Sequence, residues 1–112
     1  MPSTPSAMPA SMSDALARLW NKFRSEIEGR LSLLEAAGRA VSEGALTGEQ
    51  RESAHQAAHK LAGVLGTFGL HRGTDLARQI ELEFAEEVPA AATSELCAWI
   101  AELRMLIDRR NR

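Results

Sequence analysis

The chain has 112 residues and a formal net charge of −2, with 13 Lys and Arg against 15 Asp and Glu. This length fits one domain, which can bury a core without metals or disulfides. The charge balance lacks the basic footprint of a nucleic-acid-binding protein. A single cysteine excludes an internal disulfide and fits a reducing compartment. Because the sequence has neither a run of about 20 apolar residues nor a recognisable signal peptide, we expect a cytoplasmic protein without a membrane span.

The N-terminal segment is predicted to be a flexible tail over residues 1–12, since three of the four prolines lie there among small polar residues without an apolar period. Residues 13–112 are then a single domain. The start with methionine and the short tail favour a freestanding protein. Ser11 or Ser13 is positioned to cap the first helix, and Gly44 is a plausible terminator.

The apolar residues of this first helix recur at steps of three and four, which places them on one face. They are Leu16, Leu19, Trp20, Phe23, Ile27, Leu31 and Leu34.

A second helix is predicted to begin at Thr47-Gly48-Glu49-Gln50, which has the pattern of a capping box. Its apolar face consists of Ala54, Ala57, Ala58, Leu61, Leu65 and Phe68. Glycines loosen the chain afterwards, so we expect this helix to end between Gly66 and Leu70.

A third and a fourth helix follow. Thr74 is the expected cap of the third, and Pro89 marks the break after it. Thr93 or Ser94 is the expected cap of the fourth. Amphipathic helices joined by short connections predict an all-α protein, an antiparallel up-down four-helix bundle. No segment shows the sustained two-residue alternation of a strand.

The second helix carries a histidine on its outward face. Because a helix turns about 100° per residue, His59 points roughly 150° away from the centre of the apolar sector, and Gly63 lies nearly opposite that centre. His55 flanks His59 one turn earlier, and Gly66 lies near the end of the same exposed stripe. Lys60 is the cation adjacent to His59 in the sequence.

Gly63 is informative because glycine inside a helix costs up to ~1 kcal/mol relative to alanine. At an outward position it gains no core packing in return. A partner that comes close to His59 would explain it. The alternative is that glycine is simply tolerated there, or that the helix already frays toward Gly66.

The run Ala58-His59-Lys60-Leu61-Ala62-Gly63, followed by Leu65-Gly66-Thr67-Phe68-Gly69-Leu70, resembles the signature of histidine-containing phosphotransfer (HPt) domains. These are four-helix bundles that relay phosphoryl groups in bacterial two-component phosphorelays. The specific resemblance covers Ala54 to Glu81. It implies that His59 is the phospho-accepting histidine and that Gly63 lets a receiver domain dock. Glu81 matches a position where the family often has a glutamine that hydrogen-bonds the histidine ring.

This chain departs from the family pattern at two positions. Ala62 stands where a lysine is frequent, and Val64 where a serine is frequent. Lys60 is therefore a candidate for stabilising the phosphoryl group, with Arg78 as a second candidate. Either side chain has the alternative role of a solvated surface cation.

The docking face for a partner is expected around His59. It would include His55, Ala62, Gly63 and Gly66, with Leu16 or Leu19 of the first helix as possible additions.

The resemblance implies reversible phosphoryl transfer between His59 and the aspartate of a receiver domain. The protein would be a phosphotransfer intermediate rather than a conventional enzyme. It has no P-loop and no kinase-type glycine loop, so no autonomous kinase activity is expected. The expected partner is a response-regulator receiver domain, a hybrid histidine kinase, or both, without nucleic acid or membrane. We expect a monomer that holds no cofactor, with Mg²⁺ supplied by the receiver domain.

Two other functions stay open at this stage. His55 and His59 have the i, i+4 spacing that can chelate zinc, but Gln56 stands where zinc proteases have their glutamate, so no metal site is predicted. A non-catalytic (pseudo-HPt) module that binds a partner and never accepts phosphate is the main alternative.

Overall fold

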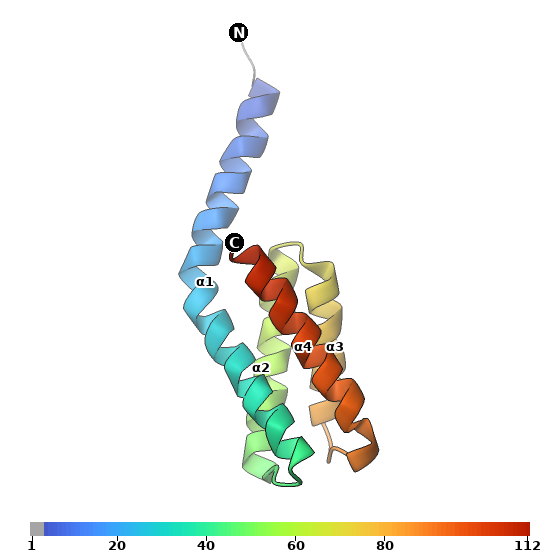
Figure 1. The fold of residues 1–112 in the computed structure, drawn as a ribbon. Coiled ribbons are helices and arrows are strands. Elements are labelled where there is room, and N and C mark those ends of the chain that lie inside the picture. The colour runs from blue at the N-terminus through green and yellow to red at the C-terminus, as the bar shows by residue number, and fades with distance from the viewer. Residues whose placement is uncertain (1–3) are drawn as a thin grey trace.

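The computed structural model describes residues 4–112, with side chains from residue 12 onward. It contains four α-helices and one short 3-10 turn: α1 (Thr4–Ser42), α2 (Gly48–Thr67), α3 (His71–Phe84), η1 (Ala90–Ala92) and α4 (Thr93–Arg110). Successive helices run in opposite directions, and each packs against its neighbours in the order α1, α2, α3, α4 and back to α1 (Figure 1). The predicted all-α antiparallel four-helix bundle is confirmed.

The first helix is longer than the sequence predicts. It begins at Thr4, so the expectation that Ser11 or Ser13 caps it was wrong. Ala, Met and Leu are good helix formers, and the helix continues through both serines. The predicted tail over residues 1–12 falls mainly on residues that lie outside the described structure or the described side chains, and its flexibility stays a prediction. In Figure 1 the N-terminal part of α1 extends past the other helices, and the molecule measures 64 × 22 × 21 Å.

The ends of α2 follow the sequence signals. The Thr47 hydroxyl accepts a hydrogen bond from the Gln50 backbone N–H at 3.0 Å, so Thr47 caps the helix as predicted. Gly44, just after α1, has a φ of 67°, and Gly69, just after α2, has a φ of 71°. Both occupy the left-handed region that glycine adopts most readily, which explains why each helix stops there.

The start of α3 differs from the prediction. The helix begins at His71, after Leu70, so Thr74 lies inside its first turn and does not cap it. The Thr74 hydroxyl instead donates to the Ala62 carbonyl oxygen of α2 at 3.3 Å. This contact joins α3 to α2 one turn along α2 from His59. A local capping pattern and a contact between helices need the same hydroxyl, and here packing between helices determines its partner.

Neither predicted cap of α4 is used as a cap. Ala92 precedes the helix, and both Thr93 and Ser94 lie within it. The 3-10 turn η1 leads directly into the first turn of α4 and replaces a side-chain cap.

The core is apolar and fills the space between the four helices. Its largest fully buried side chains are Ile27, Leu31, Leu34, Leu61, Leu65, Leu76, Ile80, Phe84, Leu96, Leu103 and Ile107. Trp20 closes one end of this core, where it contacts Phe68 edge to face with ring centroids 5.0 Å apart. Its indole N–H donates to the Asn111 side-chain oxygen at 2.7 Å. These contacts hold the C-terminal ends of α2 and α4 against α1.

Arg104 of α4 binds two carboxylates of α1. It donates to Glu28 at 2.7 and 2.9 Å and to Glu35 at 2.8 and 3.0 Å. Hydrogen bonds from Arg104 lower the pKa of both carboxyl groups, against the opposing effect of their partial burial. The same hydrogen bonds raise the pKa of the Arg104 guanidinium. This cluster fixes α4 against α1 on the side of the bundle formed by those two helices.

Candidate phosphotransfer site

His59 of α2 and Glu81 of α3 form the centre of the site. The His59 Nδ1 atom lies 2.8 Å from Glu81 Oε2. The histidine side chain is 70 % exposed, whereas that of Glu81 is 23 % exposed. Helical rotation predicted the exposure of His59, the family resemblance implied its contact with Glu81, and the structure brings the two residues together.

This contact determines which ring nitrogen is available. An ionised carboxylate only accepts hydrogen bonds, so the neutral imidazole must carry its proton on Nδ1 to make this one. The lone pair then lies on Nε2, at the other side of the ring, on an exposed side chain. An imidazole held in this tautomer by a fixed acceptor is the arrangement that nucleophilic chemistry at Nε2 requires.

His55 lies one turn before His59 and faces the same carboxylate. Its Nε2 atom is 3.9 Å from Glu81 Oε2, and its side chain is 30 % exposed. The sequence placed His55 on the docking face but did not predict its approach to Glu81. The signal was present in the i, i+4 spacing, because two such residues face the same element packed beside their helix.

Gly63 is exposed, and a Cβ atom added to it would meet nothing within 4 Å. Gly66 is also exposed, and a Cβ atom there would lie 3.6 Å from the Thr74 hydroxyl. Both glycines therefore leave open surface on α2 beyond His59, as the sequence predicted.

Ala62 differs from that expectation. Its side chain is only 5 % exposed. The reason is that α3 packs against this side of α2, where Thr74 reaches the Ala62 carbonyl. The exposed stripe is narrower than helical rotation alone suggested, and Ala62 supplies no open surface for docking.

Both candidate cations are exposed. Lys60 follows His59 on α2. Arg78 lies on α3 between Thr74 and Glu81, which both contact α2. Leu16 is 36 % exposed and Leu19 is half-buried.

Within the described residues, no group of three or more His, Cys, Asp and Glu side chains is arranged to hold a metal ion. His55 and His59 are both directed to Glu81 instead.

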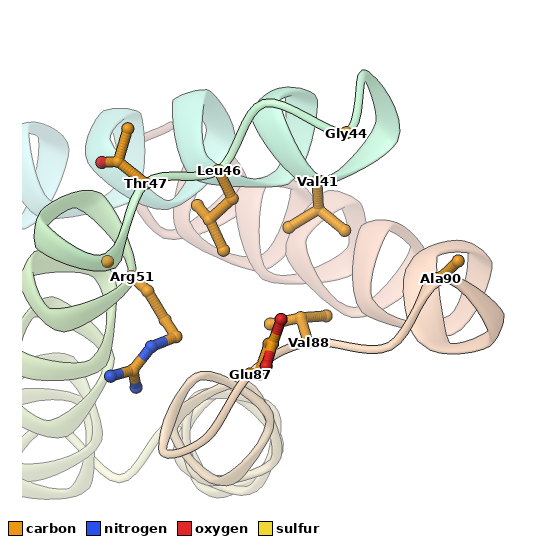
Figure 2. Close-up of a pocket in the computed structure, with 9 residues that line it drawn as sticks. Val41, Gly44, Leu46, Thr47, Arg51, Glu87, Val88 and Ala90 are labelled. Atoms are coloured by element: carbon orange, nitrogen blue, oxygen red, sulfur yellow. The ribbon is translucent and has the colours of Figure 1, made fainter.

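A separate pocket of ≈ 490 Å³ lies at one end of the bundle and shares no residue with the histidine site. It is formed by the α1–α2 connection and by the segment after α3, and it includes Arg51, Glu87 and Val88 (Figure 2). The Arg51 guanidinium donates to the Phe84 carbonyl oxygen at 2.7 Å. Arg51 therefore holds the end of α3 to α2.

Comparison with known proteins assigns the family. The model of the Hpt domain matches residues 18–111, and the chain therefore belongs to the Hpt domain family. A similar relative is Protein RcaC of Microchaete diplosiphon, which is 35 % identical over 66 residues. That match covers 59 % of this chain and 10 % of the relative, so the chain corresponds to about a tenth of the relative's length. No solved structure matches.

Membership of this family confirms the resemblance found in the sequence. The chain is a histidine phosphotransfer module of two-component signalling, and Hpt domains interact with receiver domains and histidine kinases in phosphorelays. Within the described residues, none of the helices is long and apolar enough to cross a membrane.

Proposed function

We propose that His59 accepts a phosphoryl group at Nε2 from the aspartyl phosphate of a receiver domain and returns it in the reverse reaction. The observation that carries this proposal is the 2.8 Å contact between His59 Nδ1 and Glu81 Oε2 on an otherwise exposed imidazole. It favours the tautomer whose Nε2 lone pair faces solvent, where a partner can reach it.

The transfer balances without any proton leaving the histidine. The Nε2 lone pair forms a bond to phosphorus while the bond from phosphorus to the aspartate oxygen breaks, and the aspartate leaves as a carboxylate. The ring keeps its Nδ1 proton and gains positive charge. Glu81 is negatively charged and hydrogen-bonded to that proton, so it stabilises the product as well as orienting the nucleophile. The reverse reaction uses the same groups.

The chain itself is proposed to hold no cofactor. Phosphoryl transfer needs alignment and charge stabilisation more than covalent assistance. The receiver domain is expected to bring Mg²⁺, while this chain supplies an oriented imidazole on a rigid helix. Lys60 is the first candidate among its own cations for contact with the phosphoryl oxygens, and Arg78 is the second.

The partner is proposed to dock over the exposed part of α2 around His59. Gly63 leaves room for a close approach, while His55 and Gly66 border the same surface. Contacts of this kind are small and transient. A receiver domain, a hybrid histidine kinase or both are the proposed partners of a monomeric, cytoplasmic protein.

The test is phosphorylation of the purified protein by a phosphorylated receiver domain and, separately, by phosphoramidate. The expected product is an acid-labile, base-stable phosphate that is lost in His59→Gln. His71→Gln is a matched control, because His71 is exposed at the start of α3 and does not belong to the site. Label that persists in His59→Gln would overturn the assignment of the acceptor. A protein that binds a receiver domain but takes no label from either donor would be a non-catalytic interaction module.

A further inference from the structure

The two histidines of α2 face one oxygen of Glu81 at different distances, 2.8 Å from His59 Nδ1 and 3.9 Å from His55 Nε2. We propose that His55 is a positioning residue that acts through Glu81: protonated His55 draws the carboxylate away from His59 and slows phosphoryl transfer. The inference rests on the proposed function, since it concerns the reactivity of His59 Nε2.

The two distances separate the roles of the histidines. A nitrogen–oxygen distance of 2.8 Å is a hydrogen bond, whereas 3.9 Å is too long for one. Neutral His55 therefore makes no hydrogen bond to Glu81 and leaves that oxygen to His59. A protonated imidazole attracts a carboxylate over 3.9 Å by charge alone. Because histidine ordinarily changes its charge between about pH 5 and 8, the influence of His55 depends on its protonation.

Partial burial makes the attraction effective. Glu81 is 23 % exposed and His55 is 30 % exposed, so water screens the pair less than it screens a fully exposed pair. His59 is 70 % exposed and can rotate into solvent when its acceptor is drawn away. The His59 imidazole then loses its orientation, while the packing of the helices stays unchanged.

The other charged groups near His55 have defined partners or positions. On α2, Arg51 donates to the Phe84 carbonyl oxygen, and Glu52 accepts from the Gln56 side chain at 3.5 Å. From α3, Arg78 lies one turn before Glu81 and is exposed.

On the side of α2 toward α1, a shallow hollow is lined by Leu33, Ala36, Thr47, Glu49, Gln50 and Ser53. Glu49 is the charged group of this hollow, and it lies more than one helical turn before His55. Within the described residues, the ion pair of His55 is the one with Glu81.

The transferred phosphoryl group is anionic, so the repulsion between His55 and the His59 ring is offset by attraction to the phosphoryl oxygens. The expected sign of the effect therefore follows from the loss of the orienting contact with Glu81. Protonation of His55 is expected to lower the rate of His59 phosphorylation by about two- to fivefold, as for partly exposed ion pairs.

The experiment compares His55→Gln, which stays neutral, with His55→Lys, which stays charged, in the full-length protein. His71→Gln is the control for loss of a histidine. The rate of phosphorylation by phosphoramidate is measured from about pH 6 to about pH 8. The wild-type protein is expected to match His55→Gln at high pH and to fall below it at low pH. His55→Lys should be slower than His55→Gln at both ends of the range, and His71→Gln should follow the wild type.

A second readout needs no phosphorylation. Nitrogen chemical shifts of the His59 ring report the fraction of neutral imidazole with its proton on Nδ1. At about pH 8 this fraction is expected to be lower in His55→Lys than in His55→Gln. Equal tautomer fractions and superimposable rate profiles in the two variants would overturn the role of His55. Failure of His59 to take phosphate in any variant would overturn the proposed function instead, and the tautomer measurement would still decide the inference.

Discussion

His59 and Glu81 are 22 residues apart in the chain, and their contact of 2.8 Å joins α2 to α3. The hydrogen bond from Thr74 to the Ala62 carbonyl joins the same pair of helices nearer the start of α3. The acceptor that orients the imidazole is thus fixed by the packing of two helices rather than by a flexible loop.

Replacement of Glu81 tests the orienting contact. Glu81→Ala removes the acceptor and is expected to lower the rate of His59 phosphorylation by about 10- to 100-fold, the equivalent of one charge-assisted hydrogen bond. Glu81→Gln keeps an acceptor oxygen and should lose less. Phosphoramidate labelling measures both rates. Glu83→Gln removes a neighbouring acidic group of α3 and should leave the rate unchanged, and an unaltered rate in Glu81→Ala would contradict the role of Glu81.

Gly63 separates docking from chemistry. In Gly63→Leu the larger side chain enters open surface, so the fold is expected to persist while a receiver domain is hindered. Transfer from a phosphorylated receiver should fall by about tenfold or more, whereas labelling by phosphoramidate should change little. Gly29→Leu is the matched control, because Gly29 is a helical glycine of α1 that also has nothing within 4 Å. If Gly63→Leu lowers the rate of phosphorylation equally with both donors, Gly63 affects the reaction at His59 and not the docking of the receiver domain.

The ion-pair cluster of Arg104 is expected to contribute to stability in a pH-dependent way. Arg104→Gln should lower the free energy of unfolding by about 1 kcal/mol near neutral pH, since the cluster is partly exposed. The pKa values of Glu28 and Glu35 are lowered in the folded protein, chiefly by hydrogen bonds from Arg104. Their contribution is therefore present above the ordinary carboxyl pKa of 4.5 and is lost as the pH falls through the lowered values.

Denaturant unfolding of the wild type and Arg104→Gln at several pH values measures this contribution. The difference in stability between the two proteins should shrink as the pH drops below about 4.5. A difference that stays constant down to low pH would show that Arg104 acts through packing and not through its carboxylates.

The turn after α2 depends on Gly69. Its φ of 71° lies in the left-handed region, so Gly69→Ala is expected to destabilise the protein by about 1 kcal/mol, although its Cβ atom has open space. Gly63→Ala is the opposite case, since an ordinary helical position should gain up to ~1 kcal/mol from alanine. Thermal unfolding of the two variants should therefore shift the midpoint in opposite directions, and shifts of the same sign would refute this account.

The sequence predicted the four helices and the exposure of His59 because both depend on local patterns. Helical rotation is enough to expose His59, and the capping pattern at Thr47 is satisfied within one turn. Glu81 was found through family resemblance, since no local pattern relates a residue of α3 to a ring on α2.

Two of the wrong predictions and one contact that was missed concern the packing between helices. Thr74 looks like a cap in the sequence, but it hydrogen-bonds across to α2. Ala62 lies at the edge of the apolar sector, and its burial depends on how closely α3 approaches. The nearness of His55 to Glu81 has the same origin. Rotation about one helix axis cannot supply such distances, because they depend on the separation of two axes.

The cluster of Arg104 lies on α1 and α4, whereas His59, Glu81 and His55 lie on α2 and α3. The reactive groups and the ion pairs of Arg104 therefore lie on different helix pairs, the former on α2 and α3 and the latter on α1 and α4. Exposed substitutions on α2 and α3 can alter partner preference and reactivity without removing the ion pairs of Arg104. Exposed positions of α1 and α4 offer places to attach a label or a tether while the imidazole stays unchanged.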